Sequence, residues 1–112
     1  MYSMKKSNLI LLKAPITVNS INVTGVIIGQ HYKDKHAESI NNEIVIQLVL
    51  SLDEKSFDAD STSRGIEYYV ADIQLKNEED KMKCYRLIWL FEVSSLEIIG
   101  VVNAFRVKRP KK

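Results

Sequence analysis

Apolar residues recur at every second position along several segments of this chain. The strongest example is Glu43–Leu52, which would carry on one face Ile44, Ile46, Leu48, Leu50 and Leu52. Because successive side chains of a strand point to opposite faces of a sheet, this spacing predicts a strand with one apolar and one mixed face. The β-branched residues of the segment also favour a strand over a helix.

The C-terminal half contains three further strand patterns. Ile66–Lys76 interleaves apolar and polar residues, and Lys81–Val93 has at every second position Tyr85, Leu87, Trp89, Phe91 and Val93. The short polar connection of residues 77–80 predicts that these two strands form an antiparallel hairpin. Leu96–Lys108 is apolar on both faces in its middle, which is typical of a central strand. The last three strands are therefore predicted to form a meander.

The N-terminal half is less regular. Ile21–Tyr32 is rich in Val and Ile, and its two glycines, Gly25 and Gly29, predict a strongly bent or bulged strand. Ile16–Val18 is either a short separate strand or the same strand before a kink. The one place where the sequence suggests a helix is Lys33–Asn42, over one or two turns.

Two longer connections join these segments, Gln30–Asn42 and Asp53–Gly65. The second contains Ser, Asp, Thr and Gly throughout, a composition that predicts an exposed and mobile loop. Such loops often carry binding residues, so we expect functional residues in this loop.

The size of the chain predicts one domain. Its 112 residues leave no room for two independent cores, and 46% hydrophobic with 27% charged residues is the composition of a globular protein. We expect one β-rich domain over residues 1–112 with a basic C-terminal tail at residues 108–112. The predicted fold is all-β, or β-rich with one short helix. Its architecture would be a small barrel, such as an OB-like barrel, or a compact antiparallel sandwich of five to six strands.

The sequence contains no recognisable targeting or membrane segment. The apolar run Leu9–Leu12 ends at Lys13, whereas a secretory signal needs roughly 7 to 15 apolar residues. No stretch has the uniform apolar character of a membrane span. Cys84 is the only cysteine, so an intrachain disulfide is impossible, and we expect a buried structural thiol. These features predict a soluble, cytoplasmic protein with no membrane partner.

Two histidines form the first weak candidate for a metal site. His31 and His36 have Asp34 and Glu38 nearby, and these four could bind a metal if the loop folded back on itself. A solvated loop with two surface histidines is the expected alternative.

Four carboxylates form the second weak candidate. Asp58 and Asp60, with Asp53 and Glu54 before them, could gather a hard cation or act as paired acid and base. They lack the glycine and the terminal glutamate of a calcium loop, so an acidic, flexible loop is expected. No phosphate-binding glycine loop and no nucleophile with a base beside it is recognisable. The sequence therefore predicts that the protein is not an enzyme and uses no cofactor or metal.

Charge is distributed unevenly along the chain. The net charge is +4 over residues 1–36, −8 over residues 37–80 and +6 over residues 81–112, although the whole chain carries only +2. Basic ends therefore flank an acidic middle. If the terminal strands pair, the basic ends would form one face.

The basic ends predict a nucleic-acid-binding module. Five positive charges fall in the last seven residues, namely Arg106, Lys108, Arg109, Lys111 and Lys112. The aromatic and basic residues that would join them are Tyr32, Lys33, Lys35, Tyr68 and Tyr69. Such a set suits the phosphates of single-stranded DNA or RNA and the stacking of its bases on exposed rings. Trp89 and Phe91 are expected to fill the core instead.

The acidic middle supports an alternative function. Eleven acidic residues fall between Glu38 and Asp80, and they could bind a basic protein in place of nucleic acid. An inhibitor, an immunity protein against a basic nuclease toxin, or an accessory subunit of a complex would fit this pattern. Carboxylates gathered on one surface would favour this alternative. Basic residues that share a face with exposed tyrosines would favour nucleic acid.

Overall fold

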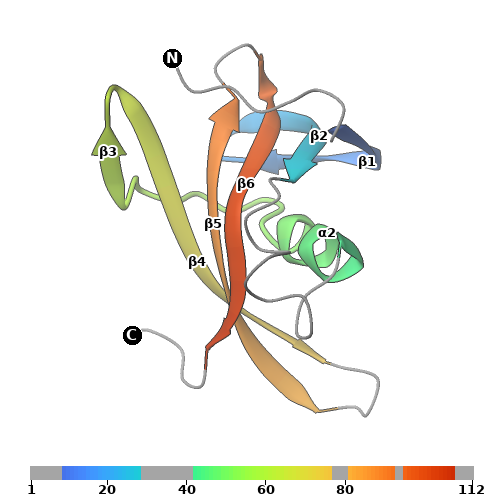
Figure 1. The fold of residues 1–112 in the computed structure, drawn as a ribbon. Coiled ribbons are helices and arrows are strands. Elements are labelled where there is room, and N and C mark those ends of the chain that lie inside the picture. The colour runs from blue at the N-terminus through green and yellow to red at the C-terminus, as the bar shows by residue number, and fades with distance from the viewer. Residues whose placement is uncertain (1–8, 29–41, 77–80, 93–94, 108–112) are drawn as a thin grey trace.

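The computed structural model describes residues 9–28, 42–76, 81–92 and 95–107. Within these residues the chain forms six strands and one short helix (Figure 1). The elements are β1 (Leu9–Val18), β2 (Ile21–Ile28), α2 (Asn42–Leu50), β3 (Ser61–Ser63), β4 (Ile66–Lys76), β5 (Met82–Glu92) and β6 (Ser95–Val107).

The strands form one sheet in the order β1-β2-β6-β5-β4-β3. All neighbours are antiparallel except β2 and β6, which run parallel. The sheet curls into a half-barrel, and α2 lies inside the curl (Figure 1). The prediction of a β-rich fold with one short helix and a barrel-like sheet is confirmed.

The C-terminal meander is also confirmed. β4 pairs with β5 over eight positions, from Tyr69 opposite Trp89 to Lys76 opposite Met82. β5 then pairs with β6, which lies between β5 and β2 and is the predicted central strand. The links between these consecutive strands are short, so each strand pairs with the next one along the chain. These pairings could therefore be predicted from the sequence.

The strand predicted for Glu43–Leu52 is wrong, because this segment forms α2. The fully buried side chains of α2 are Val45, Leu48 and Val49, and Leu52 follows at the same helical spacing in the turn after the helix. Period-two alternation and helical spacing coexist in this apolar run, and packing onto the inside of the sheet selects the helix. The helix predicted for residues 33–42 lies outside the described residues, apart from Asn42.

β1 is longer than the predicted strand at Ile16–Val18. It begins at Leu9, and its pairing with β2 changes register between Leu11 and Ile16, so a bulge interrupts the strand. The full strand was not predicted from the sequence, because the bulge interrupts the regular spacing of its apolar residues. The predicted strand from Ile21 is confirmed as far as Ile28, and residues 29–32 lie outside the described part of the chain.

Gly25 allows β1 and β2 to approach closely at this bulge. A side chain at Gly25 would place its Cβ 3.0 Å from Leu9 Cδ1 and 3.4 Å from the Ile10 carbonyl oxygen. The first and last strands of the sheet, β1 and β6, do not pair, because β2 lies between them. The condition under which the basic ends would form one face is therefore not met by these strands.

The core lies between α2 and the inner face of the sheet. Trp89 is fully buried there, with Phe57 edge-on at a centroid distance of 5.0 Å and Tyr69 stacked at 5.6 Å. The prediction that Trp89 fills the core is confirmed, while Phe91 is half-buried and packs against the core. Cys84, predicted to be buried, is half-buried.

Candidate functional site

The turn between β1 and β2 forms one wall of the candidate site. Asn19 and Ser20 have φ angles of 53° and 63°, and the flanking Val18 and Ile21 pair directly. Two left-handed residues between paired strands make the two-residue hairpin turn whose twist matches the strands. Asn tolerates this backbone conformation better than most residues, which explains its position here.

The Asn19 side chain fixes this turn to the segment that follows α2. Its Nδ2 donates to the Phe57 carbonyl oxygen at 3.0 Å, and the Phe57 N–H donates to its Oδ1 at 2.6 Å. The Asn19 backbone N–H also donates to the Lys55 carbonyl oxygen at 2.9 Å. The Asn19 amide therefore behaves like a backbone peptide unit and holds Phe57 against Trp89.

Two further hydrogen bonds hold the same segment. The Thr17 N–H donates to Asp53 Oδ1 at 2.8 Å, and the Glu54 N–H donates to the Thr17 carbonyl oxygen at 2.6 Å. β3 also lies within the predicted loop Asp53–Gly65. The segment predicted to be an irregular loop thus contains a short strand and is hydrogen-bonded to β1 near its start, while most of its side chains are exposed as predicted.

The β3–β4 hairpin forms the opposite wall. Arg64 and Gly65 have φ angles of 54° and 79° and make a second tight turn. Glu67 and Tyr69, two residues apart on β4, then point to the inner face of the sheet. Phe91 of β5 contacts Tyr69 on this face, edge to face, at a centroid distance of 5.6 Å.

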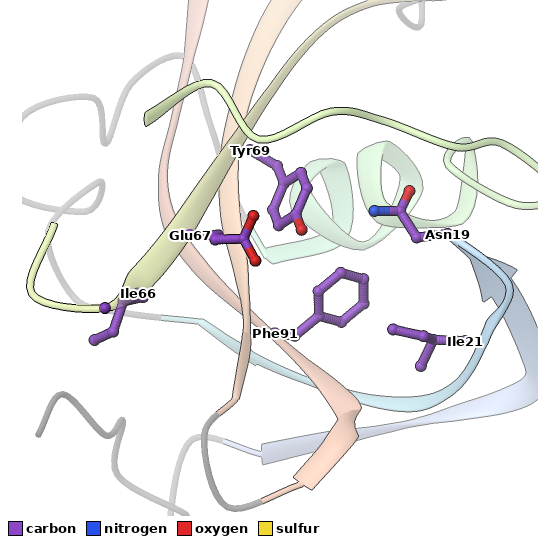
Figure 2. A pocket seen from close by; sticks show the side chains of 7 residues that line it. Asn19, Ile21, Ile66, Glu67, Tyr69 and Phe91 are labelled. Atoms are coloured by element: carbon purple, nitrogen blue, oxygen red, sulfur yellow. The ribbon is translucent and has the colours of Figure 1, made fainter. Parts of the chain in front are cut away.

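A pocket of about 300 Å³ lies between these two walls. Its lining residues are Asn19, Ile21, Gly65, Ile66, Glu67, Tyr69 and Phe91. Figure 2 shows the Glu67 carboxylate and the Tyr69 hydroxyl turned toward the same space, with the side chains of Phe91 and Ile21 on its lower side. The curl of the sheet makes this pocket, because it brings the β1–β2 turn toward β4, three strands away in the sheet order.

Negative charge dominates the electrostatics of this pocket. The pKa of the Tyr69 hydroxyl is raised, mainly by burial and then by the charge of Glu67. A hydrogen bond from the Asn19 side chain opposes this shift, and the charge of Asp58 adds to it. Tyr69 is therefore neutral at physiological pH, and two exposed carboxylates act on the same hydroxyl.

Three of the predicted nucleic-acid-binding residues lie in the described part of the chain. Tyr69 is only 9% exposed and its ring is stacked on Trp89, so it offers no free face for a base. Tyr68 is half-buried on the opposite face of β4, as neighbouring strand residues must be. Arg106 is exposed on β6. The predicted residues outside the described part are Tyr32, Lys33, Lys35, Lys108, Arg109, Lys111 and Lys112.

The structure does not bring these three residues together. Arg106 pairs with Tyr85, and Tyr85 pairs with Ile73, which is four residues along β4 from Tyr69. Arg106 instead shares its face of the sheet with Lys83, two residues before Tyr85 on β5. Lys83 carries no sequence signal of its own, because only the pairing register shows which basic residues are neighbours.

An ion pair lies on the outer face of the sheet. Arg86 donates from Nε to Asp72 Oδ1 at 2.7 Å and from a terminal nitrogen to Oδ2 at 3.1 Å. Burial and then the charge of Asp72 raise the pKa of the Cys84 thiol, with Arg86 opposing the shift. A thiol with a raised pKa is a poor nucleophile, as expected of a structural cysteine.

Within the described part of the chain, the potential metal ligands do not form a binding centre. In the ranges 9–28, 42–76, 81–92 and 95–107, no three His, Cys, Asp or Glu side chains lie close enough together to hold a metal ion. The predicted candidates Asp53, Glu54, Asp58 and Asp60 are thus not gathered into one. The candidates His31, Asp34, His36 and Glu38 lie outside these ranges.

Six of the seven pocket residues were not predicted as site residues, namely Asn19, Ile21, Gly65, Ile66, Glu67 and Phe91, of which Phe91 was expected only in the core. The usable signals were the polar pair Asn19-Ser20 between two apolar segments and the glycine at 65, both of which mark hairpin turns. Neither signal indicates that the two turns approach each other.

Comparisons with protein-family models, with curated protein sequences and with solved structures find no match to this chain. In the part of the chain that the structure describes, no helix has the length and apolar character needed to cross a bilayer.

Proposed function

We propose that this protein is a non-catalytic binding module that recognises a basic partner protein through the acidic surface around the pocket. The observation that carries this proposal is that two exposed carboxylates, Glu67 in the pocket and Asp58 before β3, both act on the Tyr69 hydroxyl. Complementary charge steers a basic partner to such a surface and selects against acidic ones.

The surrounding charges support the same function. Asp53, Glu54, Asp58, Asp60 and Glu67 are all exposed. Glu67 lines the pocket, and the other four lie in the segment between α2 and β3 that is hydrogen-bonded to Thr17 and Asn19. A toxin-neutralising immunity protein, an inhibitor and an accessory subunit all use a surface of this kind. Each of them would bind a basic protein without changing it chemically.

Single-stranded nucleic acid is the second candidate ligand, and a different observation favours it. Lys83 and Arg106 share one face at the far end of the β4–β5–β6 meander, and the sequence continues from β6 into the basic residues 108–112. The phosphates of a nucleic acid could bind Lys83 and Arg106 at this end of the molecule, because Glu67 lies at the other end of the strands.

One titration separates the two functions. Fluorescence anisotropy would be measured with the full chain and two labelled probes, an octapeptide of alternating Gly and Arg and a thirty-nucleotide oligo(dT), at about 50 mM salt. We expect the peptide to bind, more weakly as salt is raised, and an octapeptide of alternating Gly and Glu not to bind. Binding of oligo(dT) at micromolar protein with none of the Gly-Arg peptide would reject the proposal and favour nucleic acid.

A further inference from the structure

We infer that the pocket is a subsite for one arginine side chain of the partner, with its guanidinium group between Glu67 and Phe91. The inference rests on the proposed function and deepens it, because it assigns a chemical group to the pocket. Four features of the pocket carry it: its size, its apolar walls, its charge and its rigid frame.

The size of the pocket fits one long side chain. A volume of about 300 Å³ is at the lower end of small-ligand sites and cannot admit a helix or a strand of a partner. An arginine side chain has a long aliphatic stem and a planar head, and both can be enclosed in a space of this size. The partner therefore inserts one side chain into the pocket, and the remainder of its interface contacts the surrounding surface.

The walls match both parts of arginine. Ile21 and Ile66 offer apolar surface for the methylene stem, which is the part of a charged side chain that readily becomes buried. Phe91 offers an aromatic ring against which a guanidinium can lie. Lysine lacks the planar head, so it would gain less from this ring.

The polar groups of the pocket select a cation. The Asn19 amide is already engaged, because its Nδ2 donates to the Phe57 carbonyl oxygen, its Oδ1 accepts from the Phe57 N–H, and the side chain also donates to the Tyr69 hydroxyl. It therefore forms a wall of the pocket and offers no free donor to an anion. Glu67 supplies the charge, and its two oxygens can accept a paired hydrogen bond from the guanidinium. All seven lining residues are neutral or acidic, which disfavours a phosphate or a carboxylate ligand.

The frame of the pocket is fixed before any ligand arrives. Hydrogen bonds of 2.6 and 3.0 Å hold Asn19 to Phe57, and Phe57 packs edge-on against the fully buried Trp89. Tyr69 is held by stacking on the same indole. A preformed site loses little conformational freedom on binding, so even one inserted side chain can contribute measurably to affinity.

The test compares pocket variants with matched controls, using anisotropy of the Gly-Arg octapeptide and of an equivalent Gly-Lys octapeptide. Glu67→Gln and Phe91→Leu alter the pocket. Glu43→Gln makes the same change of charge on α2, and Phe105→Leu makes the same aromatic change on the outer face of β6. Circular dichroism and urea unfolding establish that each variant is folded.

We expect Glu67→Gln to weaken binding of the Gly-Arg peptide about fivefold or more, and Phe91→Leu about threefold. The two controls should change it less than twofold, and the unmodified protein should prefer the Gly-Arg peptide to the Gly-Lys peptide. Equal losses in Glu67→Gln and Glu43→Gln would overturn the arginine subsite and leave the acidic-surface function standing. Absence of any binding by the Gly-Arg peptide would instead overturn both.

Discussion

At the scale of single residues, Tyr69 links the core to the pocket. Its ring is stacked on Trp89, while its hydroxyl lies beside Glu67 and accepts a hydrogen bond from Asn19. One side chain thus contributes to stability through its ring and to the charge balance of the pocket through its oxygen. Tyr69 can be buried because its hydroxyl keeps a hydrogen bond with the Asn19 side chain.

The raised pKa of Tyr69 predicts a specific loss of stability at alkaline pH. Because the folded protein holds the phenol in its neutral form more strongly than the unfolded chain does, this contribution is fully present below about pH 10 and is lost as the pH rises through the raised pKa of the folded protein. The urea midpoint should fall as the pH rises above about 10, and it should fall less in Tyr69→Phe. The matched control is Tyr68→Phe, on the other face of β4. If the urea midpoints of Tyr69→Phe and Tyr68→Phe fell equally at alkaline pH, the loss would not come from the Tyr69 hydroxyl.

The sequence allowed some residue assignments and not others. Trp89 could be placed in the core because it sits in a long run of alternating apolar residues. Tyr69 could not, because Tyr68-Tyr69 presents two tyrosines to opposite faces and the sequence does not show which face is covered. The inner position of Tyr69 depends on α2 and Phe57, which are distant in the chain.

At the scale of elements, α2 shows how packing can decide between two periodicities. Residues 43–52 contain apolar side chains at both strand and helix spacing, so local preference does not choose between the two. In the folded chain Val45, Leu48 and Val49 of α2, with Leu52 in the turn that follows, cover the inside of a curled sheet. A strand here would leave that apolar inner face uncovered.

Two leucine variants distinguish the helix from the predicted strand. A strand would place Leu48 and Leu50 on one face, whereas in α2 Leu48 is fully buried and Leu50 is 42% exposed. We expect Leu48→Ala to lower the free energy of unfolding by about 2–5 kcal/mol and Leu50→Ala by less than about 1 kcal/mol. Urea denaturation measures both values. Similar large losses in the two variants would contradict the helix.

The β1–β2 turn supports a second prediction at this scale. Asn19→Ala removes both hydrogen bonds to Phe57 and places alanine in a left-handed conformation, so we expect a loss of about 2–4 kcal/mol in the free energy of unfolding. Asn19→Gly keeps the backbone conformation and should lose about 1 kcal/mol less. Equal losses in urea denaturation would mean that only the hydrogen bonds matter.

At the scale of the whole molecule, the curled sheet has two chemically different ends. Glu67 and the pocket lie near the start of β4, whereas Lys83 and Arg106 lie near the opposite end of the same meander. Among the described residues, the Glu67 carboxylate is thus separated along the strands from Lys83 and Arg106. Partners of opposite charge would be directed to different ends.

The fold class could be predicted because it depends on local signals. β4, β5 and β6 have readable alternation and short links, and together they specify half of the sheet. The parallel contact of β2 with β6 and the meeting of the Asn19 and Gly65 turns join segments far apart in the chain. No local pattern encodes these contacts, so the sheet order and the pocket were not predictable.

The most direct test of the central claim, that the acidic end binds a basic partner, is a nitrogen-15 chemical-shift titration of the full chain. The Gly-Arg octapeptide and oligo(dT) would be added to separate samples. We expect the peptide to shift the amide signals of residues 19–21, residues 65–69 and Phe91, and to leave those of Lys83, Tyr85 and Arg106 unchanged. Unchanged pocket signals with the peptide, together with shifts around Arg106 on addition of oligo(dT), would contradict the central claim.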